Sequence, residues 1–414
     1  MDRFIASALV AVTLVAGPPS AAAAQAPPPG AAARPTAAQK RTPPPPRTAA
    51  SPTKFDALAA EADKAREAKQ LDRAVELYRQ ALTIRPAWDE GRWNLGTALY
   101  ELEQFGDARD AFRRVLAKHP ENGTAWVFKG LCEFQLKNYD SALSDLIEAK
   151  ARGVVGGQAM ADVARYHSAI MLSRIGRFDQ ALYILDDFGL EGNDAPGVIE
   201  AMGLAVLRMP MLPSDLPGGR RELVLMAGRA RFLQAARQMA GAQSAFELLT
   251  SRYPDTPNVH YAYGVYLLPE RPEKAIELFQ RELKVSPQNV FAKLQIAFAH
   301  IRRGEYEQAL PWAKQAVDEA PTEFAARTAL GKVLLETGDL PGAIRELEAG
   351  VKLAPESPIM HFTLARAYRQ AGRNVEADKA QQEFARLNRQ LRERQNGVES
   401  VGGIPLDTPG ARNP

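Results

Sequence analysis

Apolar residues recur with the spacing of an α-helix through the middle of the chain. In one stretch, the apolar positions of a first helix are Trp93, Leu95, Leu99 and Leu102. A second helix follows a short turn at residues 105–107, and its Ala108 and Phe112 lie four residues apart on one face. The pattern predicts two short helices joined by a tight turn.

Three further residues of this helical pair have a predicted structural role. Gly96 lies inside the first helix and costs about 1 kcal/mol relative to alanine, so we expect the second helix to approach closely there. Asp107 is placed to cap the second helix. Pro120 blocks continuation of that helix and lets the next one begin.

The same pattern returns at a nearly constant interval of about 34 residues. Nine alanines mark it: Ala74, Ala108, Ala142, Ala181, Ala242, Ala275, Ala309, Ala343 and Ala377. Prolines such as Pro86, Pro120 and Pro321 each follow their alanine at the same distance along the chain. Such a period is typical of a stacked helical array, in which each unit buries its apolar face against its neighbours. The chain is therefore predicted to be an all-α solenoid.

These positions resemble the tetratricopeptide repeat family. The residues that carry the resemblance in one unit are Leu95, Gly96, Tyr100, Ala108, Phe112 and Pro120. The resemblance covers roughly residues 55–391 and implies a right-handed superhelix of about nine helix-turn-helix repeats. It departs from the family at Val154, where proline is expected, and at residues 190–222, where the interval from Ala181 to Ala242 is nearly doubled.

The predicted organisation has six segments. They are a signal peptide at 1–26, a disordered Pro/Ala-rich linker at 27–54, four repeats at 55–189, an irregular insertion at 190–222, five repeats at 223–391 and a disordered tail at 392–414.

The insertion is the least repetitive part of the array. It is predicted to be one helix followed by a Pro/Met loop, because Pro210, Pro213 and Pro217 exclude a helix there. The apolar side chains of this loop are candidate contacts for a partner: Met209, Met211 and Leu212. Alternatively, they fold back and fill the gap left by an incomplete repeat.

The N-terminal segment 1–26 has the parts of a secretory signal. Arg3 precedes an apolar run at residues 4–16, and cleavage choices of the A-x-A type follow after Ala24 or Ala26. The run is shorter than the roughly 20 apolar residues that span a membrane, although an uncleaved anchor is the alternative. We expect an exported bacterial protein, periplasmic or secreted.

Charge and composition exclude several classes of function. The net charge of +3 becomes −2 without the five unopposed cations of residues 27–54, so no basic stripe is expected for nucleic acid. No two of the five histidines lie three or four residues apart, and the single Cys132 falls in an apolar helix. We therefore expect no metal, no cofactor and no catalytic activity.

The resemblance also implies a binding groove lined by the first helices. The residues at the inward phase are Trp93, Thr97, Tyr100, Val127, Leu131, Phe134, Tyr166, Tyr261, Phe291, Phe298, Phe362, Arg366 and Arg369. Most of them are apolar, so we expect an apolar peptide or helical segment to bind there. Alternatively, these side chains pack between neighbouring helices. The paired lysine and asparagine of family members that bind chaperone tails are missing.

The sequence thus predicts an exported, non-catalytic scaffold that binds protein or peptide partners. Contact with a membrane is expected only through partners or an uncleaved signal segment. The alternative function is an accessory factor for envelope assembly or polysaccharide export at the outer membrane. The oligomeric state is left open.

Overall fold

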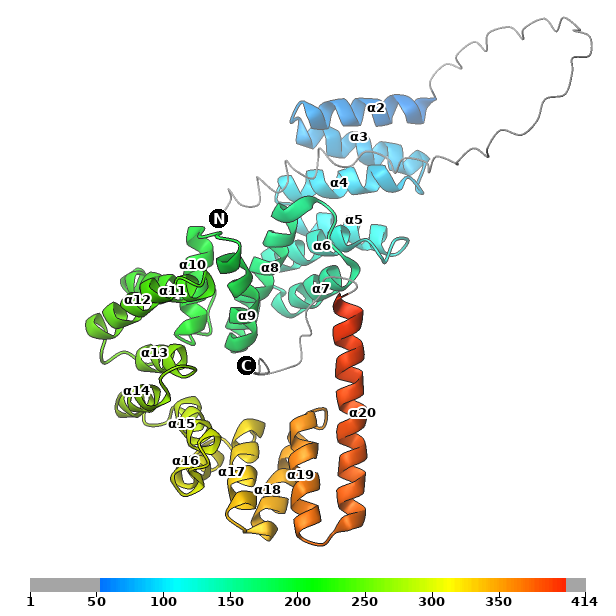
Figure 1. Ribbon diagram of the computed structural model, residues 1–414. Coiled ribbons are helices and arrows are strands. Elements are labelled where there is room, and N and C mark those ends of the chain that lie inside the picture. The colour runs from blue at the N-terminus through cyan, green and yellow to red at the C-terminus, as the bar shows by residue number, and fades with distance from the viewer. Residues whose placement is uncertain (1–52, 400–414) are drawn as a thin grey trace, which may run out of the picture. The chain divides into compact units, whose positions relative to one another are not determined.

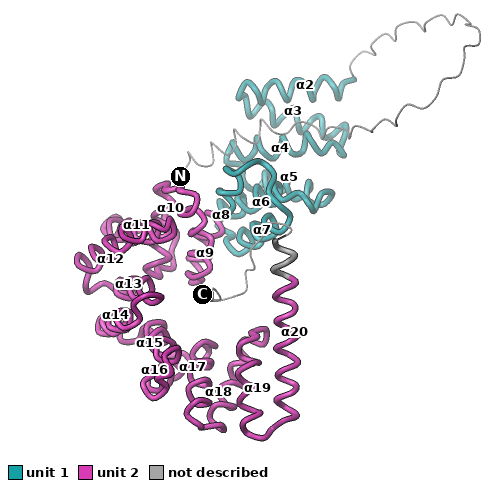
Figure 2. Tube along the Cα trace, viewed as in Figure 1, with its two compact units in different colours: residues 1–164 teal, residues 165–414 magenta. Residues whose placement is uncertain are grey.

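Short helices follow one another along the part of the chain that the computed structural model describes, residues 53–399 (Figure 1). These residues form nineteen α-helices, two short 3-10 turns and no strand. The all-α prediction is therefore confirmed. The chain divides into two compact units, residues 1–164 and 165–414 (Figure 2).

Unit 1 contains three antiparallel helical pairs. They are α2 (Lys54–Glu67) with α3 (Leu71–Ile84), α4 (Asp89–Glu101) with α5 (Phe105–Leu116), and α6 (Gly123–Gln135) with α7 (Tyr139–Arg152). The turn inside each pair places one residue in the left-handed region: Lys69, Glu103 and Lys137 have φ of 57°, 59° and 62°. These residues are one repeat period apart, so one turn geometry recurs with the helices.

Unit 2 continues the series. Helix α8 (Gly157–Arg174) crosses the unit boundary and is followed by α9 (Phe178–Leu190). Five further pairs are α11 (Arg221–Ala235) with α12 (Met239–Arg252), α13 (Val259–Leu267) with α14 (Pro272–Val285), α15 (Val290–Arg302) with α16 (Tyr306–Glu319), α17 (Phe324–Glu336) with α18 (Leu340–Leu353), and α19 (Pro358–Gln370) with α20 (Asn374–Glu399). With the pairs of unit 1, the described helices form nine helix-turn-helix repeats, as predicted.

Small residues in the first helices let the second helices approach. A Cβ atom added to Gly96 would lie 3.0 Å from the ring of Phe112, which confirms the close approach expected there. Gly264 meets Phe279 and Gly331 meets Leu347 in the same way. The free-energy cost of a glycine inside a helix is therefore offset by tight packing between the two helices of a repeat.

In the last repeats, the first helices lie on the inner side of the stack. Helix α15 contacts α17, and α17 contacts α19, whereas the second helices α16 and α18 make no contact of that extent in the described part of the chain. Helices that lie closer together in a curved stack are on the inside of the curve. Figure 2 shows the pairs of unit 2 following one another along an arc.

The insertion is ordered and packed. Helix α10 (Pro196–Val206) contacts both α9 and α11, and the Pro/Met loop folds into two 3-10 turns, η1 (Pro213–Asp215) and η2 (Gly218–Arg220). Leu212 is buried, and Met209 and Met211 are partly buried against the core of unit 2. The prediction of a partner contact is therefore wrong for Leu212, which fills the gap as the alternative has it, whereas Met209 and Met211 keep part of their surface exposed and stay predicted contacts.

Three predicted boundaries differ from the structure. Helix α5 begins at Phe105, so the prediction that Asp107 caps it is wrong: Gln104 is the N-cap, and Asp107 lies inside the first turn. Helix α2 begins at Lys54, where Thr53 caps it through a reciprocal hydrogen bond with Asp56. Helix α20 ends at Glu399, beyond the predicted start of the tail at 392, because residues 392–399 include no proline and several good helix formers. The predicted signal peptide and almost all of the linker lie outside the described residues. Within residues 53–399, no helix is long and apolar enough to cross a membrane.

Candidate partner-binding surface

In unit 1, the predicted groove residues are buried except for Trp93, which is partly buried. Trp93 meets the rings of Phe112 and Phe128 edge-on, with ring centroids 5.4 and 5.6 Å away. Tyr100 is buried between Phe105 and Phe128, and this burial raises the pKa of its hydroxyl. Aromatic pairs of this geometry stabilise packing between helices.

The remaining predicted groove residues of unit 1 are also enclosed. The buried side chains are Thr97, Val127, Leu131 and Phe134. The Thr97 hydroxyl donates a hydrogen bond to the Asn94 carbonyl oxygen at 3.0 Å, so it is satisfied within its own helix. For these positions the expectation of an open groove is wrong, because neighbouring helices of the stack already cover the inward phase.

In unit 2, the inserted helix occupies part of the predicted groove. Tyr166 is partly buried and lies against Gly197 at the start of α10. Tyr261 on α13 is buried, and Asn258, just before α13, donates a hydrogen bond to the Leu207 carbonyl at the end of α10. The insertion is thus tied to the first helix of a later repeat.

Arg208 is the centre of this contact. Its guanidinium carbon lies 3.8 Å from the ring centroid of Phe291, 5.0 Å from that of Phe178 and 5.7 Å from that of Tyr261. The Asp179 carboxylate lies 3.6 Å away, and the Arg208 side chain is only 9% exposed. We call these five residues the Arg208 cluster. Residue spacing along the chain does not predict this cluster, because its members come from four separate segments.

Replacing Arg208 by alanine is expected to lower the free energy of unfolding of unit 2 by about 2 kcal/mol, because a desolvated cation over aromatic rings is worth about that much. Urea denaturation followed by circular dichroism measures the change. Arg302→Ala is the matched control, because Arg302 is exposed and should shift the midpoint little. Equal shifts for the two variants would contradict a structural role for the Arg208 cluster.

Phe291 and Phe298 lie on α15. Phe291 is 38% exposed, although one face of its ring is covered by Arg208. Phe298 is partly buried against the core of the last repeats. Part of each ring therefore remains on the surface formed by the first helices.

The predicted groove residues of α19 are exposed or partly exposed. Phe362 is 38% exposed and its ring contacts Phe384 of α20 at 5.3 Å between centroids. Arg366 forms a 3.0 Å ion pair with Glu336 of α17, and Arg369 forms one of 2.8 Å with Asp378. The structure therefore keeps an accessible apolar and cationic surface on the inner helices of the last repeats.

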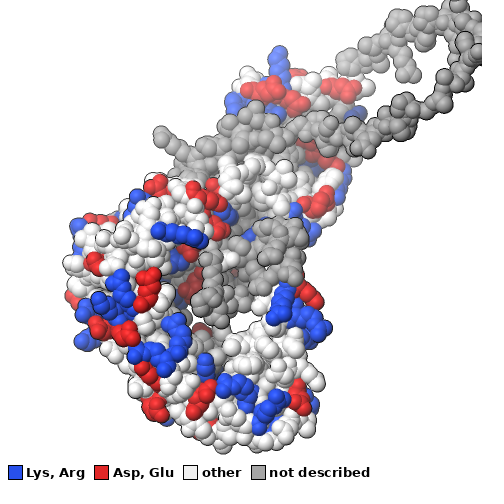
Figure 3. Space-filling view, in the orientation of Figure 1, with Lys and Arg blue, Asp and Glu red and all other residues white. Residues whose placement is uncertain are grey.

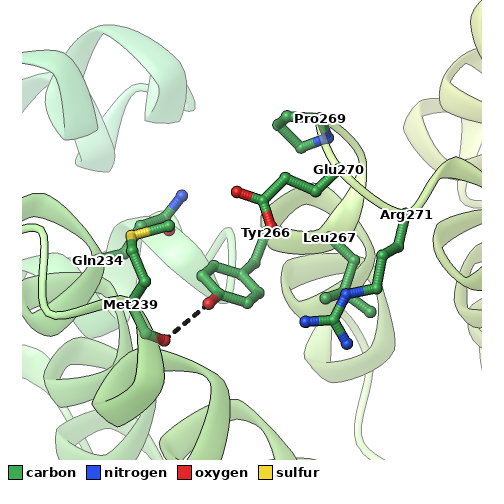
Figure 4. A pocket seen from close by; sticks show the side chains of 7 residues that line it. All are labelled: Gln234, Met239, Tyr266, Leu267, Pro269, Glu270 and Arg271. Carbon is green, nitrogen blue, oxygen red and sulfur yellow. Dashed lines mark hydrogen bonds between the residues drawn. The ribbon is translucent and has the colours of Figure 1, made fainter.

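A shallow pocket lies elsewhere in unit 2, beside the α11–α12 and α13–α14 turns (Figure 4). Its lining residues are Gln234, Met239, Tyr266, Leu267, Pro269, Glu270 and Arg271. The Tyr266 hydroxyl donates a 2.8 Å hydrogen bond to the Met239 carbonyl oxygen, so this hydroxyl is already engaged by the backbone. The lining lacks a serine, cysteine or histidine that could serve as a nucleophile or base.

Reactive chemistry is not favoured at the single cysteine either. Cys132 is fully buried in α6, and burial raises the pKa of its thiol to about 12, so the nucleophilic thiolate is scarce near neutral pH. Among the described residues, no group of histidine, cysteine, aspartate and glutamate could hold a metal ion.

Parts of the chain match models of a helical repeat family. Residues 94–153 match one tetratricopeptide repeat model, and residues 266–333 and 303–361 match a second one. The chain therefore contains tetratricopeptide repeats in these segments. The matched ranges include α5 to α7 in unit 1 and α14 to α18 in unit 2.

Individual relatives are distant. Tetratricopeptide repeat protein 34 of Homo sapiens is 28% identical over 141 residues, which are 34% of this chain and 24% of that protein. The match therefore spans about a quarter of the length of this relative. Among solved structures, MamA from Desulfovibrio magneticus RS-1 is 19% identical, with 41% of this chain and 96% of that chain covered and a TM-score of 0.38. YrrB, described as having an unusual peptide-binding site, is 15% identical, with 40% and 86% covered and a TM-score of 0.36.

Proposed function

We propose that this tetratricopeptide repeat protein is a non-catalytic scaffold that holds a peptide or helical segment of a partner protein. Tetratricopeptide repeats generally bind proteins or peptides. The proposed contact surface is the inner face of the last three repeats, formed by α15, α17 and α19. The observation that carries the proposal is Phe362, a large aromatic side chain that is 38% exposed at an inward-phase position.

Burial elsewhere supports this choice of surface. In unit 1 the inward-phase side chains are buried except for the partly buried Trp93, and near α13 the Arg208 cluster occupies the corresponding positions. The apolar groove expected along the whole array is therefore reduced to the C-terminal repeats. A preformed surface of this kind lowers the ordering cost of binding, and aromatic anchors supply contact area at low entropy cost.

Selection of random 12-residue peptides against the full chain tests the proposal. The expected result is enrichment of peptides whose affinity falls about tenfold or more in Phe362→Ala, since truncating an aromatic anchor costs about 1–2 kcal/mol. Far-ultraviolet circular dichroism checks that the variant stays folded. The matched control is Leu353→Ala, which removes an exposed apolar side chain from the second helix α18. A library without enriched peptides, or an equal loss of peptide affinity in both variants, would contradict the proposal.

Export is a separate part of the proposal. The apolar run at residues 4–16 and the cleavage choices after Ala24 and Ala26 support it. Expression of the full chain in a bacterial host, followed by fractionation and N-terminal sequencing, tests it. A mature protein that begins at Gln25 or Pro27 outside the cytoplasm is the expected result, and an intact N-terminus in the cytoplasm would contradict it.

A further inference from the structure

The first helices of the last three repeats carry an unbalanced charge. Helices α15, α17 and α19 contain one acidic residue, Glu336. Four cations of these helices are exposed or partly exposed: Arg302, Lys332, Arg366 and Arg369. We call these four residues the cationic row. Acidic and basic residues are interspersed on the face that Figure 3 shows. The second helices α16 and α18 each carry residues of both signs.

The other two cations of these helices are already neutralised by the second helices. Lys293 of α15 is buried and forms an ion pair with Glu319 of α16. Arg327 of α17 pairs with Glu346 of α18. These two pairs hold a first helix against its own second helix, so they do not belong to the inner surface.

The cationic row is largely available to a partner. Arg302 and Lys332 form no ion pair or hydrogen bond with the residues that the structure describes. Arg369 pairs with Asp378, but both side chains are well exposed, and ion pairs of that kind contribute little. Arg366 is the most engaged member, because Glu336 lies 3.0 Å away and is partly buried.

The row has a regular spacing along the stack. Lys332 and Arg366 are one repeat period apart and occupy the same position on successive first helices, and Arg302 lies one turn beyond that position on α15. Packed helices are about 8–10 Å apart. An extended chain advances about 3.3 Å per residue, so about every third residue of a peptide crossing these helices meets the next cation.

We propose that the cationic row binds an extended acidic peptide segment in which Asp or Glu recurs at every third position. An apolar residue of the same segment would contact Phe362 and Ile359, which are 38% and 57% exposed. This inference rests on the proposed function and names the chemistry of its partner. Because the cations are spread over three repeats, they match side-chain carboxylates rather than one terminal carboxylate.

Fluorescence anisotropy with the full chain and three amidated 12-residue peptides tests the inference. The first peptide has Glu at every third position and Leu and Ser elsewhere, the second has Lys in place of Glu, and the third has the same composition as the first with all Glu at one end. The first peptide is expected to bind about tenfold more tightly than the other two, and more weakly as salt rises. A free C-terminus in place of the amide should leave its affinity unchanged.

Charge reversal identifies the surface. Arg302→Glu combined with Lys332→Glu is expected to weaken binding of the first peptide at least about tenfold, which corresponds to about 1.4 kcal/mol. Lys314→Glu combined with Lys352→Glu is the matched control, because it changes the net charge equally on exposed positions of α16 and α18. The control should change affinity less than about twofold.

Several results would overturn the inference. They are equal affinities for the three peptides, equal losses in the two double variants, or tighter binding of a 12-nucleotide single-stranded DNA than of the acidic peptide. If library peptides lose affinity in Phe362→Ala but not in the charge-reversal variant, the cationic row is not the determinant and the proposed function stands. If no peptide of either kind binds, both fall.

Discussion

Gly228→Ala is expected to destabilise unit 2 by about 3 kcal/mol, because the new methyl group would clash with the backbone of a neighbouring helix. A Cβ atom at Gly228 would lie 1.8 Å from the carbonyl oxygen of Ile199 on α10. The same contact is reinforced by Gly203, whose Cβ would lie 1.9 Å from the carbonyl oxygen of Val224 on α11. Both obstacles are backbone atoms, so the helices must separate to relieve the clash.

Urea denaturation followed by circular dichroism measures this loss, and hydrogen exchange of α10 and α11 locates it. Gly106→Ala is the matched control, since Gly106 is helical and a Cβ atom there would meet no other atom within 4 Å. That variant is expected to be slightly stabilised, because alanine favours the helix over glycine. Equal stability of Gly228→Ala and the original chain would show that α10 and α11 are less closely packed than the structure has them.

Phe112→Ala is expected to destabilise unit 1 by about 4 kcal/mol, as typical for a fully buried phenylalanine. The Phe112 side chain is completely buried. It stacks on Phe128 with ring centroids 5.0 Å apart and an interplanar angle of 13°, and it fills the space left by Gly96. Its removal leaves a cavity between the second and third repeats.

Tryptophan fluorescence follows this change, because the Trp93 ring lies against Phe112. The unfolding midpoint is expected to fall, and the native emission of Trp93 should shift to longer wavelength. Ile147→Ala is the control, since Ile147 is exposed on α7 of the same unit. A loss below about 1 kcal/mol for Phe112→Ala would contradict a tightly packed aromatic core.

The same contacts show that Trp93 has a role in packing. From its phase in the first helix, Trp93 was expected to line an open groove, but its ring packs on Phe112 and Phe128. Trp93→Ala therefore tests the core of unit 1 rather than partner binding. Phe362, at the corresponding phase of the last repeat, remains accessible because no further repeat follows α20 in the described chain.

Periodicity and residue type determined the architecture. The constant interval of the alanines requires that each repeat pack like its neighbours, and the small Gly96 requires a large partner such as Phe112. These are local relations that recur along the chain, so the sequence by itself specified helices, turns, repeat number and the place of the insertion.

Only the tertiary structure decided which inward-phase side chains are open. Phase on a helix states the direction of a side chain but not what covers it, and the cover comes from segments far away in sequence. Arg208, from the insertion, reaches Phe291 in the third repeat after it, and neighbouring helices enclose Val127 and Leu131. The accessible surface is therefore smaller than periodicity predicts and lies on the last three repeats, where Arg208 covers one face of Phe291 but Phe298 and Phe362 stay partly exposed.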